Sequence, residues 1–279
     1  MTAWQDILDQ IHTLQEAARK EGYPLWYRGH RLAEWTLQTS LHRHVENSLN
    51  AIGITLPEGE KVEMMRDVYK SLYRKYKARA WHLLTFREMS DWGIIFSMQH
   101  HGIPTRLLDW SESFICALYF AHCGRKSSDD AAIFILSPEH LNYANYGYTG
   151  QVALGENVGN SNVEEVLYHP GYVSFAYPLH TIAVAPVLSN PRMLAQQSAF
   201  TLSGDPFQPM EERYSQHVKK IVLPAATYEE SLRFLNLGGR GHFSYFPDFE
   251  GLRNELIEGL NREVKIAQEY LDGRRADES

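Results

Sequence analysis

Residues 99–110 constrain the fold of this chain more than any other stretch of the sequence. They combine two histidines, an arginine and an aspartate with two residues that shape the backbone, Gly102 and Pro104. Glycine accepts a positive φ, whereas proline fixes its own φ and pushes the preceding residue towards extended geometry. We therefore expect a stiff polar loop, and such loops commonly carry binding or catalytic side chains.

The apolar residues that follow are expected to anchor this loop to the core. Residues 114–121 have the spacing of a buried helix, and Ser111 or Ser113 can cap it. If Asp109 is drawn inward it needs a partner, and Arg106, three positions earlier, is the nearest candidate. Such a pair either fixes the loop or contacts a ligand directly.

Composition bounds the class of protein. The chain has 279 residues, a formal net charge of −7 and two cysteines. Its acidity argues against a protein that coats nucleic acid through charge alone. Cys116 and Cys123 fall on one predicted helix, about 10 Å apart along its axis, so we expect reduced thiols. We expect neither a signal peptide nor a membrane span, and hence a cytoplasmic protein without a membrane partner.

The order of predicted elements favours an α+β fold, with a helix-rich N-terminal half packed on a central, mostly antiparallel sheet. Strands are predicted at 25–30, 131–136, 182–186, 198–202 and 219–223, and helices at 2–20, 58–89, 92–99 and 228–235. The consecutive basic residues 42–44 favour a solvated turn. Residues 139–170 lack periodicity and suggest a lid or an insertion. We expect one domain over residues 1–279, with helices 2–20 and 251–272 as extensions.

Three further features have chemical potential. Arg28 lies at the mouth of a predicted buried strand, where it is either a surface arginine lying over Trp26 or Trp35 or a functional group. His100 and His101 end a predicted helix, whose carbonyl end should favour their protonation. The basic run within residues 74–79 is either a solvated helix face or a surface for a nucleic-acid strand.

Several of these segments resemble the FRG domain family, named for a Phe-Arg-Gly signature that appears here as Tyr27-Arg28-Gly29. The likeness continues through residues 99–110, 117–121, 191–200 and 246–251, and covers about residues 22–255. Two departures from the family pattern are Ser111, where threonine is usual, and Ser198, where glycine is common.

A second, more distant likeness rests on Arg28 at a strand end, on the hydroxyl-bearing turn from Thr105 to Ser111 before the helix over 117–121, and on Gln196 or Gln197 before a late strand. In these features the chain resembles the ADP-ribosyltransferases, and the likeness implies NAD as substrate. It implies catalytic roles for Arg28, Asp109 and Gln196. It further implies nucleotide-binding roles for Tyr27, Gly29, His30, His101, Thr105, Arg106, Trp110, Ser111, Tyr119 and Gln197. Because glutamine cannot supply a negative charge to an oxocarbenium-like transition state, either Asp109, Asp248 or Glu250 would supply it or the target nucleophile would need no activation. We therefore expect the regions near Arg28, Arg106 and Gln196 to converge around one nucleotide-sized cavity.

Three functions remain in competition on sequence grounds. The first is an ADP-ribosyltransferase or NAD glycohydrolase, acting as a toxin or defence effector on a protein, a nucleic acid or water. The second is a non-catalytic domain that recognises a nucleotide or nucleic-acid end. The third, a metal hydrolase, is ranked last because His30, His100, His101 and Asp109 include no pair at the i, i+4 spacing of a zinc-binding helix, so no metal is expected. The sequence sets no oligomeric state.

Overall fold

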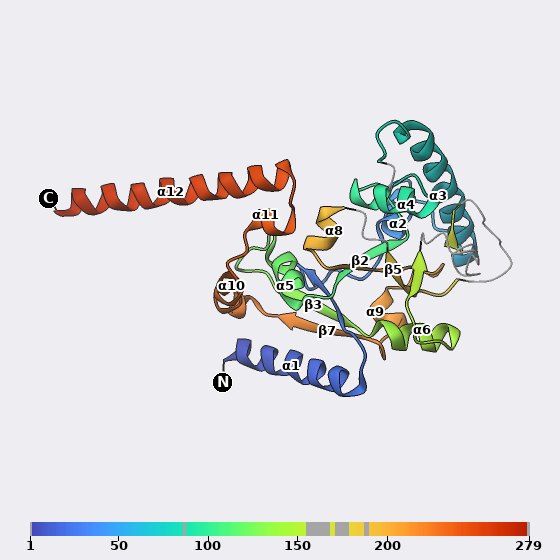
Figure 1. The fold of residues 1–279 in the computed structure, drawn as a ribbon, viewed down its shortest axis with the longest axis horizontal. Coiled ribbons are helices and arrows are strands. Elements are labelled where there is room, and N and C mark those ends of the chain that lie inside the picture. The colour runs from blue at the N-terminus through green and yellow to red at the C-terminus, as the bar shows by residue number, and fades with distance from the viewer. Residues whose placement is uncertain (1, 86–87, 155–167, 171–178, 187–189, 278–279) are drawn as a thin grey trace.

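The computed structural model describes residues 2–85, 88–154, 168–170, 179–186 and 190–277 (Figure 1). Its strands are β1 (Trp26–His30), β2 (Leu107–Ser111), β3 (Ala131–Leu136), β4 (Val152–Leu154), β5 (Ile182–Pro186), β6 (Ser198–Leu202) and β7 (Val218–Leu223). Its helices are α1 (Ala3–Glu21), α2 (Ser40–Ala51), α3 (Glu58–Ala80), α4 (Asp91–His100), α5 (Phe114–His122), α6 (Pro138–Tyr146), α8 (Pro191–Ala195), α9 (Met210–Arg213), α10 (Tyr228–Leu237), α11 (His242–Tyr245) and α12 (Phe249–Asp277).

These strands form one sheet in the order β4-β5-β6-β2-β1-β3-β7. The β4–β5 pair is parallel and every other neighbouring pair is antiparallel. The helices are not interleaved with parallel strands, as they would be in an α/β fold. The predicted α+β class, with a mostly antiparallel sheet, is therefore confirmed.

Different helices cover the two halves of the sheet. Helices α2, α3 and α4 share a core with β4, β5 and β6, built around Met65, Ile95 and Val184. On the other half, α1, α5 and α10 share a core with β1, β3 and β7. Figure 1 shows these two helical groups on different sides of the molecule, with α12 extending away from both. The boundary between the two halves falls between β2 and β1.

Helix α5 lies directly on β1 because Gly29 has no side chain. A Cβ atom at this position would lie 1.8 Å from the carbonyl oxygen of Ala117 in α5. Ser113 caps the helix by accepting a hydrogen bond from the backbone N–H of Cys116, as one of the two serines was expected to do. The glycine of the signature is thus required for packing.

The structure corrects three predictions about local structure. Residues 40–51 form α2 instead of a solvated turn, because Leu41, Val45 and Leu49 recur on one helical face and are buried. The helix predicted over 58–89 ends at Ala80. In the segment suggested as a lid or insertion, α6 and β4 belong to the core and sheet, while residues 155–167 lie outside the described part.

Several other local predictions agree with the structure. Thr2 caps α1 in a capping box with Gln5, and the predicted strands all appear within two residues of their expected ends. Cys116 and Cys123 are both free thiols. No helix among the described residues is both long enough and apolar enough to cross a bilayer.

Candidate functional site

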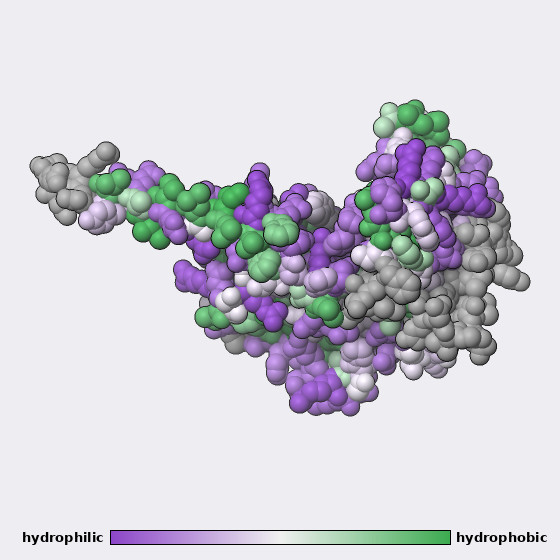
Figure 2. Space-filling view, turned by 45° about the horizontal axis from the view of Figure 1, so that its top comes forward, coloured by the Kyte–Doolittle hydropathy of each residue, from purple (hydrophilic) through white to green (hydrophobic). Residues whose placement is uncertain are grey.

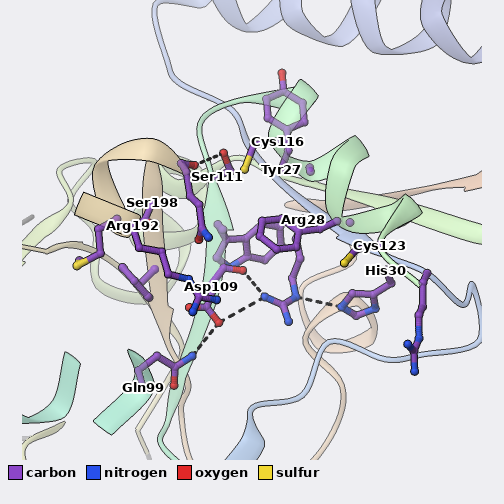
Figure 3. Close-up of a pocket in the computed structure, with 18 of the residues that line it drawn as sticks. Tyr27, Arg28, His30, Gln99, Asp109, Ser111, Cys116, Cys123, Arg192 and Ser198 are labelled. Atoms are coloured by element: carbon purple, nitrogen blue, oxygen red, sulfur yellow. Dashed lines mark hydrogen bonds and ion pairs between the residues drawn. The ribbon is translucent and has the colours of Figure 1, made fainter. Parts of the chain in front are cut away.

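A cavity of about 790 Å³ opens where the two halves of the sheet meet (Figure 3). Strands β1 and β2 are in register at Tyr27 and Ser111, whereas β1 with β3 and β2 with β6 are each in register at five positions. The two strands therefore separate beyond this first pair. A cavity of this volume falls within the usual range for small-molecule sites.

Arg28 reaches across this separation. Its Nη1 donates to the backbone carbonyl oxygen of Asp109 at 2.5 Å and lies 3.7 Å from the Asp109 carboxylate. Its Nε donates to Nε2 of His30 at 3.0 Å. Within the described part of the chain, Nη2 makes no hydrogen bond. Burial lowers the pKa of Arg28 and Asp109 opposes that change, but a guanidinium stays charged at neutral pH. Arg28 therefore keeps N–H donors for an anion.

His30 orients Arg28 as a neutral side chain. Burial, and then the charge of Arg28, lower the pKa of His30 to about 3. Because Arg28 donates to Nε2, the proton of the neutral ring is on Nδ1, which faces the carbonyl oxygen of Trp35 at 3.4 Å. His30 thus fixes the direction of the guanidinium and adds no charge to the cavity.

A chain of hydrogen bonds fixes the carboxylate of Asp109. Gln99 Nε2 donates to Asp109 Oδ2 at 2.7 Å, and the hydroxyl of Thr105 donates to Gln99 Oε1. Thr105 itself accepts from the backbone N–H of Leu107. The fully buried Thr105 therefore sets the orientation of the Gln99 amide, and Gln99 presents its N–H₂ group to Asp109. Figure 3 shows Gln99, Asp109 and Arg28 in sequence along one wall.

Ser111 ties the end of β2 to the turn before β6. Its hydroxyl donates to the carbonyl oxygen of Gln196 at 2.7 Å, and it accepts from the backbone N–H of Ser113 at 3.0 Å. The side chain of Gln196 in turn donates to the carbonyl oxygen of Tyr245 at 3.0 Å.

The turn before β6 has its left-handed residue at Gln197, with φ 46°, whereas Ser198 lies in β6. The serine therefore needs no glycine-like backbone.

The cavity is rich in positive charge although the chain is acidic. Four arginines line it, Arg28, Arg31, Arg43 and Arg192, against two carboxylates, Glu34 and Asp109. The guanidinium of Arg31 lies 4.9 Å from the centre of the Trp35 ring, and that of Arg192 lies 4.4 Å from the centre of the Phe246 ring. Arginines held by stacking and hydrogen bonds in a concave site favour a planar or phosphorylated anion.

Eight of the thirteen residues predicted for the site line this cavity. They are Tyr27, Arg28, Gly29, His30, Asp109, Trp110, Ser111 and Gln196. The regions near Arg28 and Gln196 thus converge, as expected. Tyr27 and Trp110 are nearly buried. The Tyr27 hydroxyl accepts a hydrogen bond from Gln15, and the Trp110 indole N–H donates one to Thr201, so both rings contribute mainly to the wall of the cavity.

The pairing predicted between Arg106 and Asp109 was wrong. Arg106 lies in a buried ion pair with Asp205, at 3.1 Å, and Asp205 also pairs with Arg66. Residues three apart are neighbours on a helix, but this segment enters β2, where side chains alternate between faces. Arg106 therefore points into the core beside α3 and does not line the cavity.

The other four predicted residues also lie outside the cavity lining. Thr105 is buried behind Gln99, and Gln197 forms the turn before β6. Tyr119 stacks on Tyr245 with ring centres 4.1 Å apart, and His101 is exposed at the end of α4.

The protonation expected at the end of α4 is corrected for His100. Burial, followed by the charge of Arg192, lowers the pKa of His100. Burial, together with the charge of Arg192, thus outweighs the effect of the carbonyl end of the helix.

Several residues that line the cavity were not predicted from the sequence. Gln99 and Arg192 stand within the recognised motifs, which was the available signal for both. Arg43 was assigned to a turn, although the spacing of Leu41, Val45 and Leu49 could have placed it on a helix. Arg31 and Trp35 follow β1 directly.

Neither of the other candidate carboxylates faces the cavity. Asp248 accepts from the backbone N–H of Gly251 at the start of α12, and Glu250 lies in the first turn of that helix. Among the described residues, no group of three or more His, Cys, Asp or Glu side chains is placed to hold a metal ion.

The fold and the cavity together define an α+β protein with an arginine-lined pocket at a split in its sheet. The family model of the FRG domain matches residues 23–130, from just before β1 to the start of β3. Residues 23–130 therefore match an FRG domain, as the Tyr-Arg-Gly signature within them indicated. Neither the curated proteins nor the solved structures give a significant match to this chain.

Proposed function

We propose that the cavity binds NAD and that the chain breaks its nicotinamide–ribose bond, as an ADP-ribosyltransferase or NAD glycohydrolase. The observation that carries the proposal is the meeting of Arg28, Asp109 and Gln196 in a cavity whose lining has four arginines. Consumption of NAD inside a cell would suit a toxin or a defence effector, and that role is part of the proposal.

The arginines supply the binding energy for the pyrophosphate. Arg28 has N–H donors left after its bonds to Asp109 and His30, and Arg43 and Arg192 lie in the same lining. Bidentate hydrogen bonds from a guanidinium to phosphate oxygens are strong and directional. Trp35, which is 42% exposed and lines the cavity, offers a ring face for stacking a base.

Asp109 is the carboxylate that would stabilise the transition state. When the bond between C1′ of the ribose and the nicotinamide nitrogen breaks, nicotinamide leaves with the electron pair and positive charge develops on the ribose. A hydroxyl of water or of an acceptor then adds at C1′ and releases its proton. Gln99 holds Asp109 on the cavity wall, and the side chain of Asp109 is 53% exposed. A fixed negative charge at this point would favour the cation-like ribose.

One observation favours the alternative of recognition without catalysis. Gln196 stands where the proposal would otherwise place a second carboxylate, and its amide is already bonded to the backbone of Tyr245. A cavity with this amide can bind a nucleotide and leave it intact.

Release of nicotinamide from NAD, followed chromatographically, separates the two functions. The proposed enzyme releases nicotinamide, Arg28→Lys loses most of the activity, and Asp109→Asn lowers kcat by roughly 100-fold or more with binding retained. Arg74→Lys, at an exposed position on α3, serves as the matched control. Binding of NAD that stays intact would establish the recognition domain instead, and absence of both binding and release would refute the proposal.

A further inference from the structure

Helix α12 leaves the body of the protein and continues alone (Figure 1). It has 29 residues, which corresponds to about 44 Å. Every residue from 260 to 272 is exposed, so the described remainder of the chain does not cover this part on any side. Figure 2 shows hydrophobic residues along the projecting arm. An isolated helix of this kind gains little stability by itself, and its apolar side chains would remain in water.

Five of the apolar residues of α12, over two heptads, follow the spacing of a coiled coil. They recur at alternating intervals of three and four residues, at Ile257, Leu260, Val264, Ala267 and Leu271. The large members of this seam are 41%, 57%, 59% and 54% exposed at Ile257, Leu260, Val264 and Leu271. This 3.5-residue repeat keeps one stripe facing a partner helix with the same repeat.

The charges of α12 do not oppose pairing with an identical helix. In the heptad that the seam defines, Glu258, Arg262, Lys265, Glu269 and Asp272 fall on the outer positions. Lys265 and Glu269 form an ion pair there, 3.9 Å apart. Beside the seam of a parallel pair, Glu263 of one copy would face Gln268 of the other, and Leu256 would face Asn261, so no like charges meet. A partner helix with charged residues at its seam positions would instead place charge against the apolar seam of α12.

We propose that α12 is the dimerisation helix of this protein and that its partner is α12 of a second copy, paired in parallel. Each large seam side chain can bury on the order of 100 Å² of apolar surface when fully covered. With the flanking side chains, two copies would bury on the order of 1,000 Å², which corresponds to a reversible dimer.

Equilibrium sedimentation of the full chain across the micromolar range tests this proposal. We expect a concentration-dependent shift from the mass of one chain to that of two. Val264→Glu should weaken the dimer by roughly 30-fold or more, because both copies would carry a charge into the seam. Ile266→Glu is the matched control, since Ile266 is 65% exposed on the outer face. It should change the dissociation constant less than about threefold.

Two results would overturn the proposal. One is a wild-type chain that stays monomeric at every concentration, including the case in which it gains mass only on addition of a different protein. The other is an equal effect of the two substitutions. Thermal unfolding of both variants provides the folding control, because neither side chain contacts the core clusters.

Discussion

Arg28 in β1 donates a hydrogen bond of 2.5 Å to the backbone carbonyl oxygen of Asp109 in β2, across the point where the sheet separates. The side chain thus replaces a strand-to-strand hydrogen bond and holds the two halves of the sheet together. The half with β1 is covered by α5, and the half with β2 shares a core with α2, α3 and α4. The cavity therefore has walls from both halves, and the packing of either half affects its shape.

We predict that Gly29→Ala destabilises the protein without any ligand present. The new Cβ would lie 1.8 Å from the Ala117 carbonyl oxygen, so α5 would have to move away from β1. The expected loss in the free energy of unfolding is at least about 2 kcal/mol, measured by urea denaturation. Gly59→Ala in α3 is the control, because nothing lies within 4 Å of its added Cβ, and it should leave stability unchanged or slightly raised. Equal stability of Gly29→Ala and wild type would contradict the close packing of α5 on β1 at Gly29.

The buried cluster around Asp205 should contribute to stability rather than to binding. Asp205→Ala would leave Arg66 and Arg106 without this carboxylate, and the backbone N–H of Leu179 without its acceptor. We expect a loss of about 3–5 kcal/mol in the free energy of unfolding. Asp109→Ala, at a 53% exposed carboxylate, should lose less than about 1 kcal/mol. The account of Arg106 would fail if Asp205→Ala were the milder of these two changes.

Acidification should destabilise the protein through its buried histidines. Burial lowers the pKa of His42 to about 3, from an ordinary value of 6.5. The unfolded chain therefore binds a proton at His42 below about pH 6.5, whereas the folded chain does not until about pH 3. Stability falls as the pH falls through this window, by about 2 kcal/mol for this histidine between pH 7 and pH 5.

His42→Asn tests the contribution of this single side chain. Asparagine retains a polar atom near Nδ1, which lies 2.7 Å from the Thr39 hydroxyl, and it does not titrate. Denaturant midpoints measured at pH 7 and pH 5 should lie closer together in this variant than in the wild type. An unchanged difference would show that His42 is protonated alike in both states.

The local elements were predictable because their signals are local. Caps such as Thr2 and Ser113, and the alternation or helical spacing of apolar residues, define most helices and strands within two residues. The proximity of Arg28 and Gln196 was predicted from a resemblance to a family and not from the spacing of residues in the sequence. The ends of β1 and β2 separate because of pairings with distant strands, and no short stretch of sequence encodes such pairings.

The errors have equally specific causes. Arg106 and Asp109 were paired by helical distance in a segment that is extended, and the true partner, Asp205, is 99 residues away. Arg43 was missed because three consecutive basic residues outweighed the i, i+4 spacing of the leucines and valine around them. His100 was assigned a favourable helix end without knowledge of Arg192, which α8 brings close to it.

Calorimetric titration with NAD at low ionic strength tests the central claim most directly. The account predicts binding at one site per chain by the wild-type protein. Arg28→Lys should weaken binding by roughly tenfold or more, because an ammonium cannot form the paired hydrogen bonds of a guanidinium. Arg74→Lys should bind like the wild type. No heat of binding with the wild-type chain, or equal affinities for Arg28→Lys and the wild type, would contradict the claim that Arg28 belongs to a nucleotide site.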